Sequence, residues 1–230
     1  RDLWLTGGGD GISLFNTTRS RVVNNTLTGH EKGILLNKSG ENAIFANNAS
    51  GNGYGIYLSG PHNNVIETNN ICGKNEYGIY ISGSEKNRLE YNDMRDNRYN
   101  FYAVGDNDID PSNLVNGKPV AYLVDVSDEI VDSSSGAGVV YCYRCDNVTV
   151  RDLTLEKNVY GVYFHNSSRS RAENNLVSGD VNGVRLEGSS DCVVRENHLT
   201  DNDAGVLLIN SDGNVIAKND ASVNREGINL

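Results

Sequence analysis

Residues 55–77 read GIYLSGPHNNVIETNNICGKNEY, and residues 205–226 read GVLLINSDGNVIAKNDASVNRE. Counted from the glycine, both stretches carry apolar residues at positions 2, 4, 12 and 17 and Asn at positions 10 and 15. A glycine followed by Ile or Val recurs every 22 or 23 residues, with one longer gap, at Gly11, Gly33, Gly55, Gly78, Gly138, Gly161, Gly183, Gly205 and Gly227. Such a period indicates one supersecondary unit that is stacked many times.

The apolar residues at positions 2 and 4 are typical of a strand with one buried face. No segment keeps a helical apolar period for three turns, so we expect no helices. The repeat is too short for an ankyrin or TPR unit, and it lacks the L-x-x-L-x-L-x-x-N core of leucine-rich repeats. We therefore predict an all-β fold, a right-handed parallel β-helix of about ten coils that forms a single domain over residues 1–230.

Position 15 of the repeat is a polar corner that is nearly always Asn. Asn tolerates a left-handed backbone, and stacked amides can bond to one another along the axis. We interpret this column as a structural ladder, formed by Asn25, Asn47, Asn69, Asn92, Asn175, Asn197 and Asn219. The alternative, a set of sugar or ion ligands, would need only a few residues and not one in every coil.

The chain has 230 residues, of which 37% are hydrophobic, and a net charge of −10. This charge argues against binding to nucleic acid, and the absence of a long apolar run argues against membrane insertion. The chain starts at Arg1 without a signal peptide, as expected of a mature or trimmed chain. Six sequons favour an extracellular or cell-surface location and are candidate glycosylation sites, at Asn16, Asn24, Asn37, Asn48, Asn147 and Asn166.

The cysteines and histidines do not predict a metal centre. Cys142 and Cys145 form a C-x-x-C motif, which we interpret as a candidate disulfide or as two unpaired thiols, since no further zinc ligands are adjacent. Cys192 lies at position 10, where other coils carry Asn or Ser, and is interpreted as a ladder residue. Four different repeat positions are occupied by His30, His62, His165 and His198. We therefore expect no histidine metal site and no cofactor.

The repeat is interrupted between Gly78 and Gly138, and residues 100–137 are expected to form an inserted loop or hairpin flap. Alternating aspartates in this insertion resemble the start of a calcium loop. The EF-hand pattern fails because Pro111 replaces its glycine and Gly117 stands in place of the closing Glu. An acidic surface turn is the default interpretation, and calcium is the alternative, with Asp106, Asp108 and Asp110 as its candidate ligands.

The phrase DIDPSNLVNGKPVAYLVD at residues 108–125, followed by CDNVTVRDLTL at residues 145–155, resembles the NosD-like or CASH-type β-helix repeat proteins. These are found among archaeal surface-layer and cell-surface proteins. The motif N-G-K-P-V-x-Y-x-V at residues 116–124 is the most specific part of the resemblance. It implies a right-handed parallel β-helix and an exported protein, usually without catalysis. The association of NosD with copper-site maturation is not carried over, because the sequence has no His or Met cluster.

Two surface features bear on function. Glu67 and Glu90 share position 13 in adjacent coils, with Arg88 and Tyr91 nearby, and paired carboxylates serve polysaccharide lyases, epimerases and glycosidases. Tyrosines recur at position 3, which carries Leu35, Tyr57, Tyr80, Val140 and Tyr163, and before the glycine at Tyr54, Tyr77, Tyr99 and Tyr160. Stacking of aromatic rings along the strands accounts for much of this strip. The strip could also contact a neighbouring subunit, which we favour, or bind a glycan.

Both ends of the chain keep the register of the repeat. Residues 1–5 read RDLWL, like RDLTL at residues 151–155, and the chain stops at GINL. The expected end-stacking residues are Leu3, Trp4, Leu5, Ile228 and Leu230. A fragment of a longer β-helix is the alternative explanation of these ends.

We therefore predict a structural β-helix protein of an extracellular or cell-surface assembly. Copies of this chain or other surface-layer subunits would stack end to end or pack laterally into a filament, sheath or surface layer. We expect that the protein is not an enzyme. The alternative is a β-helix that binds or processes carbohydrate.

Overall fold

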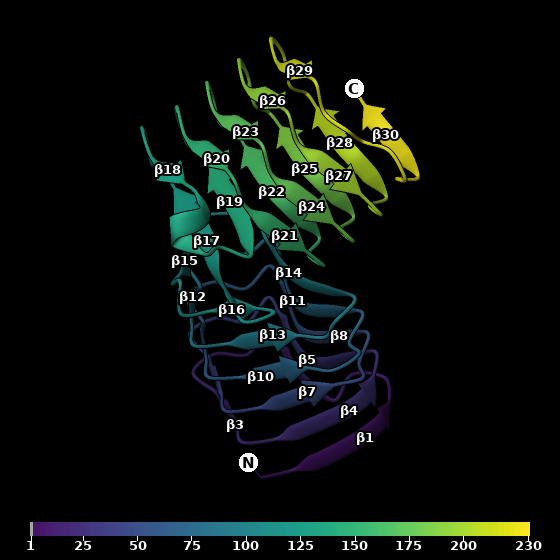
Figure 1. Ribbon diagram of the computed structural model, residues 1–230. Coiled ribbons are helices and arrows are strands. Elements are labelled where there is room, and N and C mark those ends of the chain that lie inside the picture. Colours follow the sequence, from purple (N-terminus) through teal and green to yellow (C-terminus); the bar gives the residue numbers. More distant parts are fainter. Residues whose placement is uncertain (1) are drawn as a thin grey trace. The chain divides into compact units, whose positions relative to one another are not determined.

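The computed structural model describes residues 2–230, and short parallel strands make up nearly all of its regular structure (Figure 1). The residues group into two compact units, Arg1–Gly117 and Lys118–Leu230, and each is described by itself. Within the described chain a single 3-10 turn, Ser133–Ser135, interrupts the strands, and no helix is long and apolar enough to cross a membrane. The stacked strands form a β-solenoid of about ten turns, which confirms the predicted fold class.

The first unit contains three parallel sheets, and successive turns add one strand to each sheet. The sheet that follows the repeat glycine, here called the first glycine sheet, contains β2 (Ile12–Phe15), β5 (Lys32–Asn37), β8 (Tyr54–Ser59), β11 (Tyr77–Ser82) and β14 (Tyr99–Ala103). The next sheet contains β3 (Arg21–Val23), β6 (Ala43–Phe45), β9 (Val65–Glu67), β12 (Arg88–Glu90) and β15 (Asp108–Ile109). The last contains β1 (Trp4–Gly8), β4 (Thr26–His30), β7 (Asn48–Ser50), β10 (Asn70–Cys72), β13 (Asp93–Arg95) and β16 (Leu114–Val115).

The second unit repeats this arrangement. Its glycine sheet, here called the second glycine sheet, contains β17 (Lys118–Val124), β19 (Val139–Tyr143), β22 (Tyr160–His165), β25 (Asn182–Glu187), β28 (Ala204–Ile209) and β30 (Glu226–Asn229). The next sheet contains β18 (Ile130–Val131), β20 (Thr149–Arg151), β23 (Arg171–Glu173), β26 (Val193–Arg195) and β29 (Val215–Ala217). The last contains β21 (Thr154–Glu156), β24 (Leu176–Ser178) and β27 (His198–Thr200).

Stacked columns of apolar side chains fill the interior of each unit. Ile56, Leu58 and Ile66, at positions 2, 4 and 12 of one turn, are fully buried. Each such side chain contributes roughly 1.5–3 kcal/mol by leaving water. The repeating glycine is explained by the same close stacking, because a Cβ on Gly33 would lie 2.7 Å from the carbonyl oxygen of Gly55.

Residues 100–137, which we expected to project as a loop or flap, instead supply strands to the solenoid. β14 and β15 pair in parallel with β11 and β12 in the first unit, and β17 and β18 pair with β19 and β20 in the second. The glycine marker fails here because Asn100 lies beside Gly78, and Val139 lies beside Gly161, in the paired strands. The register also places Tyr141, and not Val140, opposite Tyr163 at position 3.

Candidate functional site

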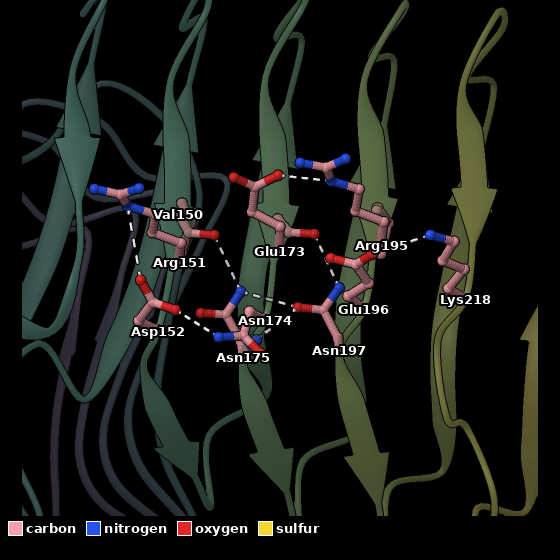
Figure 2. Close-up of polar contacts among 12 residues, drawn as sticks. Val150, Arg151, Asp152, Glu173, Asn174, Asn175, Arg195, Glu196, Asn197 and Lys218 are labelled. Carbon is pink, nitrogen blue, oxygen red and sulfur yellow. Dashed lines mark hydrogen bonds and ion pairs between the residues drawn. The ribbon is translucent and has the colours of Figure 1, made fainter.

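The Asn column at position 15 is a hydrogen-bonded ladder within each unit. In the first unit Asn25 Nδ2 donates to Asn47 Oδ1 at 2.9 Å. In the second unit Asn175 Nδ2 donates to Asn197 Oδ1 at 3.0 Å, which Figure 2 shows. Asn175 Nδ2 also donates to the Val150 carbonyl at 3.0 Å, as Figure 2 shows. The ladder continues through Asn69, Asn92 and Asn113 in the first unit and Asn219 in the second. Because these amides are bonded to the protein itself, they hold corners and are not free to bind a ligand.

Ion pairs and amide contacts run along the outside of the same corner. Figure 2 shows Glu173 accepting from Arg195 at 2.8 Å and Glu196 accepting from Lys218 at 3.3 Å, each across one turn. These side chains lie at the surface, and exposed pairs of this kind contribute less than about 1 kcal/mol each. We therefore regard this face as a structural surface and not as a site.

The calcium candidates do not gather into a site. Asp106, Asp108 and Asp110 are all exposed, and Asp110 Oδ1 accepts the main-chain N–H of Ser112 at 2.8 Å. Hydrogen bonds from Ser112 lower the pKa of Asp110. Over residues 2–230, no three His, Cys, Asp or Glu side chains are grouped closely enough to hold one metal ion.

The cysteines are all free thiols in this structure. Cys142 and Cys145, the candidate disulfide pair, are both buried, and Cys142 belongs to the core column opposite Phe164. A hydrogen bond with Cys145, together with burial, raises the pKa of the Cys142 thiol. The main-chain N–H of Cys192 donates to Asn214 Oδ1 at 2.8 Å, so Cys192 lies in the polar column at position 10.

The remaining predicted positions lie at the surface. Five of the sequon asparagines, Asn16, Asn24, Asn48, Asn147 and Asn166, are exposed, and Asn37 is half-buried. Of the expected end-stacking residues, Leu5 is half-buried and the others are exposed, namely Leu3, Trp4, Ile228 and Leu230. Glu67 and Glu90 are register partners, and Arg88 Nε donates to Glu90 at 2.6 Å. The ion pair with Arg88 leaves Glu90 less suited to acid–base work.

The outer face of the first glycine sheet carries a group of tyrosines that we call the tyrosine platform. It consists of two columns across β8, β11 and β14, one of Tyr54, Tyr77 and Tyr99 and one of Tyr57, Tyr80 and Tyr102. The rings pack on one another, with centroids 4.8 Å apart for Tyr54 and Tyr77 and 4.4 Å apart for Tyr80 and Tyr102. Burial among these rings raises the pKa of Tyr80, so its hydroxyl stays protonated. Five of the six rings are half-buried, and Tyr99 is buried.

Charged residues border the platform. Lys32, the register partner of Tyr54, pairs with Glu31 at 2.5 Å and with Asp10 at 3.4 Å. Arg98 pairs with Glu76 at 3.7 Å, and its guanidinium carbon lies 5.2 Å from the centroid of the Tyr99 ring. The platform is therefore an aromatic surface with hydrogen-bonding groups at its edge.

A second constellation lies on the second glycine sheet, and we call it the histidine cluster: Tyr163, His165, Arg185 and Glu187. Tyr163 Oη lies 2.8 Å from His165 Nδ1 and 2.8 Å from Glu187 Oε2. Arg185 Nη2 donates to Glu187 Oε2 at 2.8 Å. The Arg185 guanidinium carbon lies 4.7 Å from the centroid of the Tyr160 ring.

Burial and charge set the protonation states in this cluster. Burial lowers the pKa of the His165 imidazole, and nearby Arg185 and Arg144 act in the same direction, whereas Glu187 opposes them. Burial disfavours the ionised form of Glu187, but hydrogen bonds from Tyr163 and Arg185 outweigh it and lower the pKa of the carboxyl. At neutral pH the cluster therefore pairs a neutral imidazole with an ionised carboxylate.

This cluster was not predicted from the sequence, because its four members are of four different residue types and the histidines occupy different repeat positions. The signal that would have found it is a pair of chemically different residues one repeat apart. His165 and Glu187 form such a pair, and so do Tyr163 and Arg185.

Comparison with known proteins places the whole chain in one family. The model of the NosD family, described as periplasmic copper-binding protein, matches residues 1–118 and 120–230. The chain belongs to the NosD family. This confirms the NosD-like resemblance, and a search of curated proteins gave no match.

Several solved structures resemble this NosD-family chain at 12–13% identity. The A-module of mannuronan C-5 epimerase AlgE4 from Azotobacter vinelandii has 13% identity and a TM-score of 0.38, covering 93% of this chain and 56% of the module. Tailspike protein 2 of bacteriophage CBA120 has 12% identity and a TM-score of 0.43, covering 94% of this chain and 38% of the tailspike. Alginate lyase from Paenibacillus has 12% identity and a TM-score of 0.33, covering 96% of this chain and 80% of the lyase. These likenesses are too distant to support a functional argument.

The donor groups of this chain do not fit the copper that the NosD description implies. His30 is buried and neither of its ring nitrogens has a hydrogen-bond partner, His62 is exposed, and His198 pairs with Asp220 at 2.9 Å. These side chains lie in separate columns, and the described residues contain no group of three or more metal-binding side chains. We therefore derive no chemistry through copper.

Proposed function

We propose that this NosD-family protein is a component of the cell envelope that binds carbohydrate chains along the tyrosine platform. The observation that carries this proposal is the pair of tyrosine columns on the outward face of β8, β11 and β14. Tyrosine combines a broad apolar ring with a hydroxyl that forms hydrogen bonds. Sugar rings have apolar faces and polar edges, so a platform of this kind suits them.

The shape of the platform favours an extended polymer over a small molecule. Small-molecule sites are concave and enclose most of the ligand. Neighbouring strands of a sheet are about 4.8 Å apart, and successive rings of each column have centroids 4.4 to 5.5 Å apart along the stack. Lys32, Glu31, Glu76 and Arg98 at its edge supply charged groups that can bond to sugar hydroxyls. A chain of sugars can therefore contact several turns at once.

The family supports the proposed location. NosD is described as periplasmic, which agrees with a chain that functions outside the cytoplasm. The exposed sequon asparagines are compatible with an exported protein. Polysaccharides are abundant in that compartment and outside it.

Affinity electrophoresis through gels that contain neutral or acidic polysaccharides tests the proposal. The double variant Tyr57→Ala, Tyr80→Ala should migrate faster than the wild type in the gel that retards the wild type. Each lost ring should cost about 1–2 kcal/mol, or about 5- to 30-fold in affinity. Tyr91→Ala is the matched control, because Tyr91 is 62% exposed and lies outside the platform. Equal retardation of the double variant and the wild type would contradict the proposal.

A structural role in an envelope assembly is the second candidate, and the same platform favours it. Aromatic side chains are enriched in the cores of protein interfaces, so the platform could receive a neighbouring subunit. Light scattering separates the two candidates. A mass that rises with concentration in the wild type, but not in Tyr57→Ala, Tyr80→Ala, would favour assembly over carbohydrate binding.

A further inference from the structure

The tyrosine platform has an uncharged polar flank at the ends of its strands. Ser59 follows Tyr57 by two residues in β8, and Ser82 follows Tyr80 by two residues in β11. Side chains two residues apart on a strand lie on the same face, so these serines share the face of the tyrosines. The register pairs Ser59 with Ser82 and with Asn37 of β5. We call Asn37, Ser59 and Ser82 the serine column.

The side chains of the serine column are available for hydrogen bonds. The main-chain carbonyls of Ser59 and Ser82 accept from Lys38 at 3.1 Å and from Gly60 at 3.2 Å, so the fold uses them. In the part of the chain that the structure describes, no such contact uses the hydroxyls of Ser59 and Ser82 or the amide of Asn37. All three side chains are half-buried, and each can both donate and accept without carrying a charge.

The charged groups lie at the other edge of the platform, where the strands begin, and they are paired with one another. Lys32 Nζ lies 2.5 Å from Glu31 Oε1 and 3.4 Å from Asp10 Oδ1. Arg98 pairs with Glu76 at 3.7 Å. Two cations against three carboxylates leave these five residues with one net negative charge. An acidic polymer would have to displace a carboxylate from its partner or lie beside a charge of its own sign.

The tyrosine hydroxyls are also neutral. Burial raises the pKa of Tyr54, Tyr77 and Tyr80, and neighbouring tyrosines act in the same direction. These phenols therefore stay protonated at physiological pH and can both donate and accept. The platform and the serine column together present aromatic rings and uncharged hydrogen-bonding groups.

We propose that the tyrosine platform binds an uncharged polysaccharide, whose chain lies along the two tyrosine columns with its hydroxyls against the serine column. This inference rests on the carbohydrate-binding function proposed above and narrows it to one class of polymer. The columns run from β8 through β11 to β14 with ring-to-ring contact, so successive sugars meet equivalent groups on successive strands. A polymer without carboxylate or sulfate groups needs no free cation, and the paired charges beside the platform supply none.

Affinity electrophoresis compares gels that contain neutral polymers of glucose or mannose with gels that contain polymers of galacturonate or mannuronate. The wild type should be retarded in at least one neutral gel, equally at low and at high salt, because no ion pair forms. It should migrate through the acidic gels like a reference protein that binds no sugar. Retardation by an acidic polymer and not by a neutral one would overturn this inference and leave carbohydrate binding intact. Free migration in every gel would overturn both.

The serine column gives a second test in the neutral gel that retards the wild type. Ser59→Ala, Ser82→Ala should weaken binding by about 2- to 10-fold for each hydroxyl removed. Ser50→Ala is the matched control, because Ser50 is half-buried in the same way but belongs to β7 in another sheet. Circular dichroism confirms that each variant is folded. Equal retardation of the double variant and the wild type would overturn the contact assigned to this column.

Discussion

Asp180 occupies a repeat position where neighbouring turns carry Asn. Its Oδ1 accepts the main-chain N–H of Asn158, one turn earlier, at 2.6 Å. The main-chain N–H of Asp180 donates in the same way to Asn202 Oδ1, one turn later, at 2.9 Å. Its Oδ2 is buried without a hydrogen-bond partner, at the point where an amide would donate. Burial raises the pKa of the Asp180 carboxyl well above its ordinary value. A protonated Asp180 can replace Asn in this column, whereas an ionised one is an uncompensated buried charge.

This residue makes stability depend on pH in a defined direction. Because the folded-state pKa of Asp180 is raised, its carboxyl contributes fully to the stability of the fold below about pH 4, the pKa of an unfolded aspartate. This contribution is lost as the pH rises toward the folded-state pKa. Asp180→Asn should therefore raise the free energy of unfolding at pH 7 by about 1–3 kcal/mol and flatten its pH dependence. Urea unfolding between pH 4 and pH 8 measures both effects.

The control is Asp201→Asn, because Asp201 is exposed and lies on an outer corner of the same unit. It should leave the unfolding curve of the wild type nearly unchanged. An Asp180→Asn protein that is no more stable than the wild type at pH 7 would show that the carboxyl finds a partner in solution.

At the scale of elements, the Asn ladder decides how firmly successive turns are joined at their corners. Asn69 Nδ2 donates to Asn92 Oδ1 and to the Ile44 carbonyl, both at 2.9 Å. Its Oδ1 accepts from the main-chain N–H of Asn47 at 3.0 Å. One side chain therefore satisfies a buried carbonyl in β6 and a buried main-chain N–H at the corner that follows β6.

Asn69→Ala should destabilise the protein by about 2–4 kcal/mol, because the N–H of Asn47 and the carbonyl of Ile44 lose their partners in the interior. Thermal or urea unfolding followed by circular dichroism gives the value. Asn70→Ala is the matched control, since Asn70 is the next residue and is exposed. Equal losses in the two variants would mean that the ladder adds nothing beyond strand pairing.

Most strands could be predicted from the sequence, because a glycine and the apolar positions 2 and 4 mark one strand in nearly every turn. Prediction failed in residues 100–137, where Asn100 and Val139 take the place of the glycine. In those turns the alternation of buried and outward residues is also weak, as the burial of β14 and β17 shows, so the strand signal was weaker there. The Asn columns were visible because one residue type repeats in them.

The histidine cluster could not be found in the same way. Its members are chemically different residues that meet only because β22 and β25 pair in one register. The sequence shows the spacing of His165 and Glu187, but the bridging role of Tyr163 depends on side-chain rotamers. Such an arrangement becomes visible only in the folded protein.

At the scale of the whole molecule, each unit behaves as a stack in which a turn contacts its neighbours. Proteins of this kind have stabilities that approximate a sum of repeat and interface contributions. A copy of residues 183–204 inserted after Ala204 keeps the glycine and Asn columns in register. The enlarged protein should fold, with a larger urea m value and a higher free energy of unfolding, because one more turn is buried.

Circular dichroism in urea tests this prediction. The matched control is the same inserted copy without Leu186, because a one-residue slip turns the following side chains of a strand to the opposite face. The control protein should be less stable than the wild type. If both insertions were equally stable, the columns would not determine how the turns stack.

The stacking also gives each unit a mechanical direction. Hydrogen bonds between turns point along the stack, as the parallel pairing of β22 with β25 and of β25 with β28 shows, whereas the covalent chain runs around it. A pulling force applied to the ends of such a unit detaches one turn at a time and does not shear a whole sheet at once. With about 22 residues per turn, each detachment releases roughly 75 Å of extended chain. A stretched unit would therefore lengthen in steps of equal size, one for each turn that detaches.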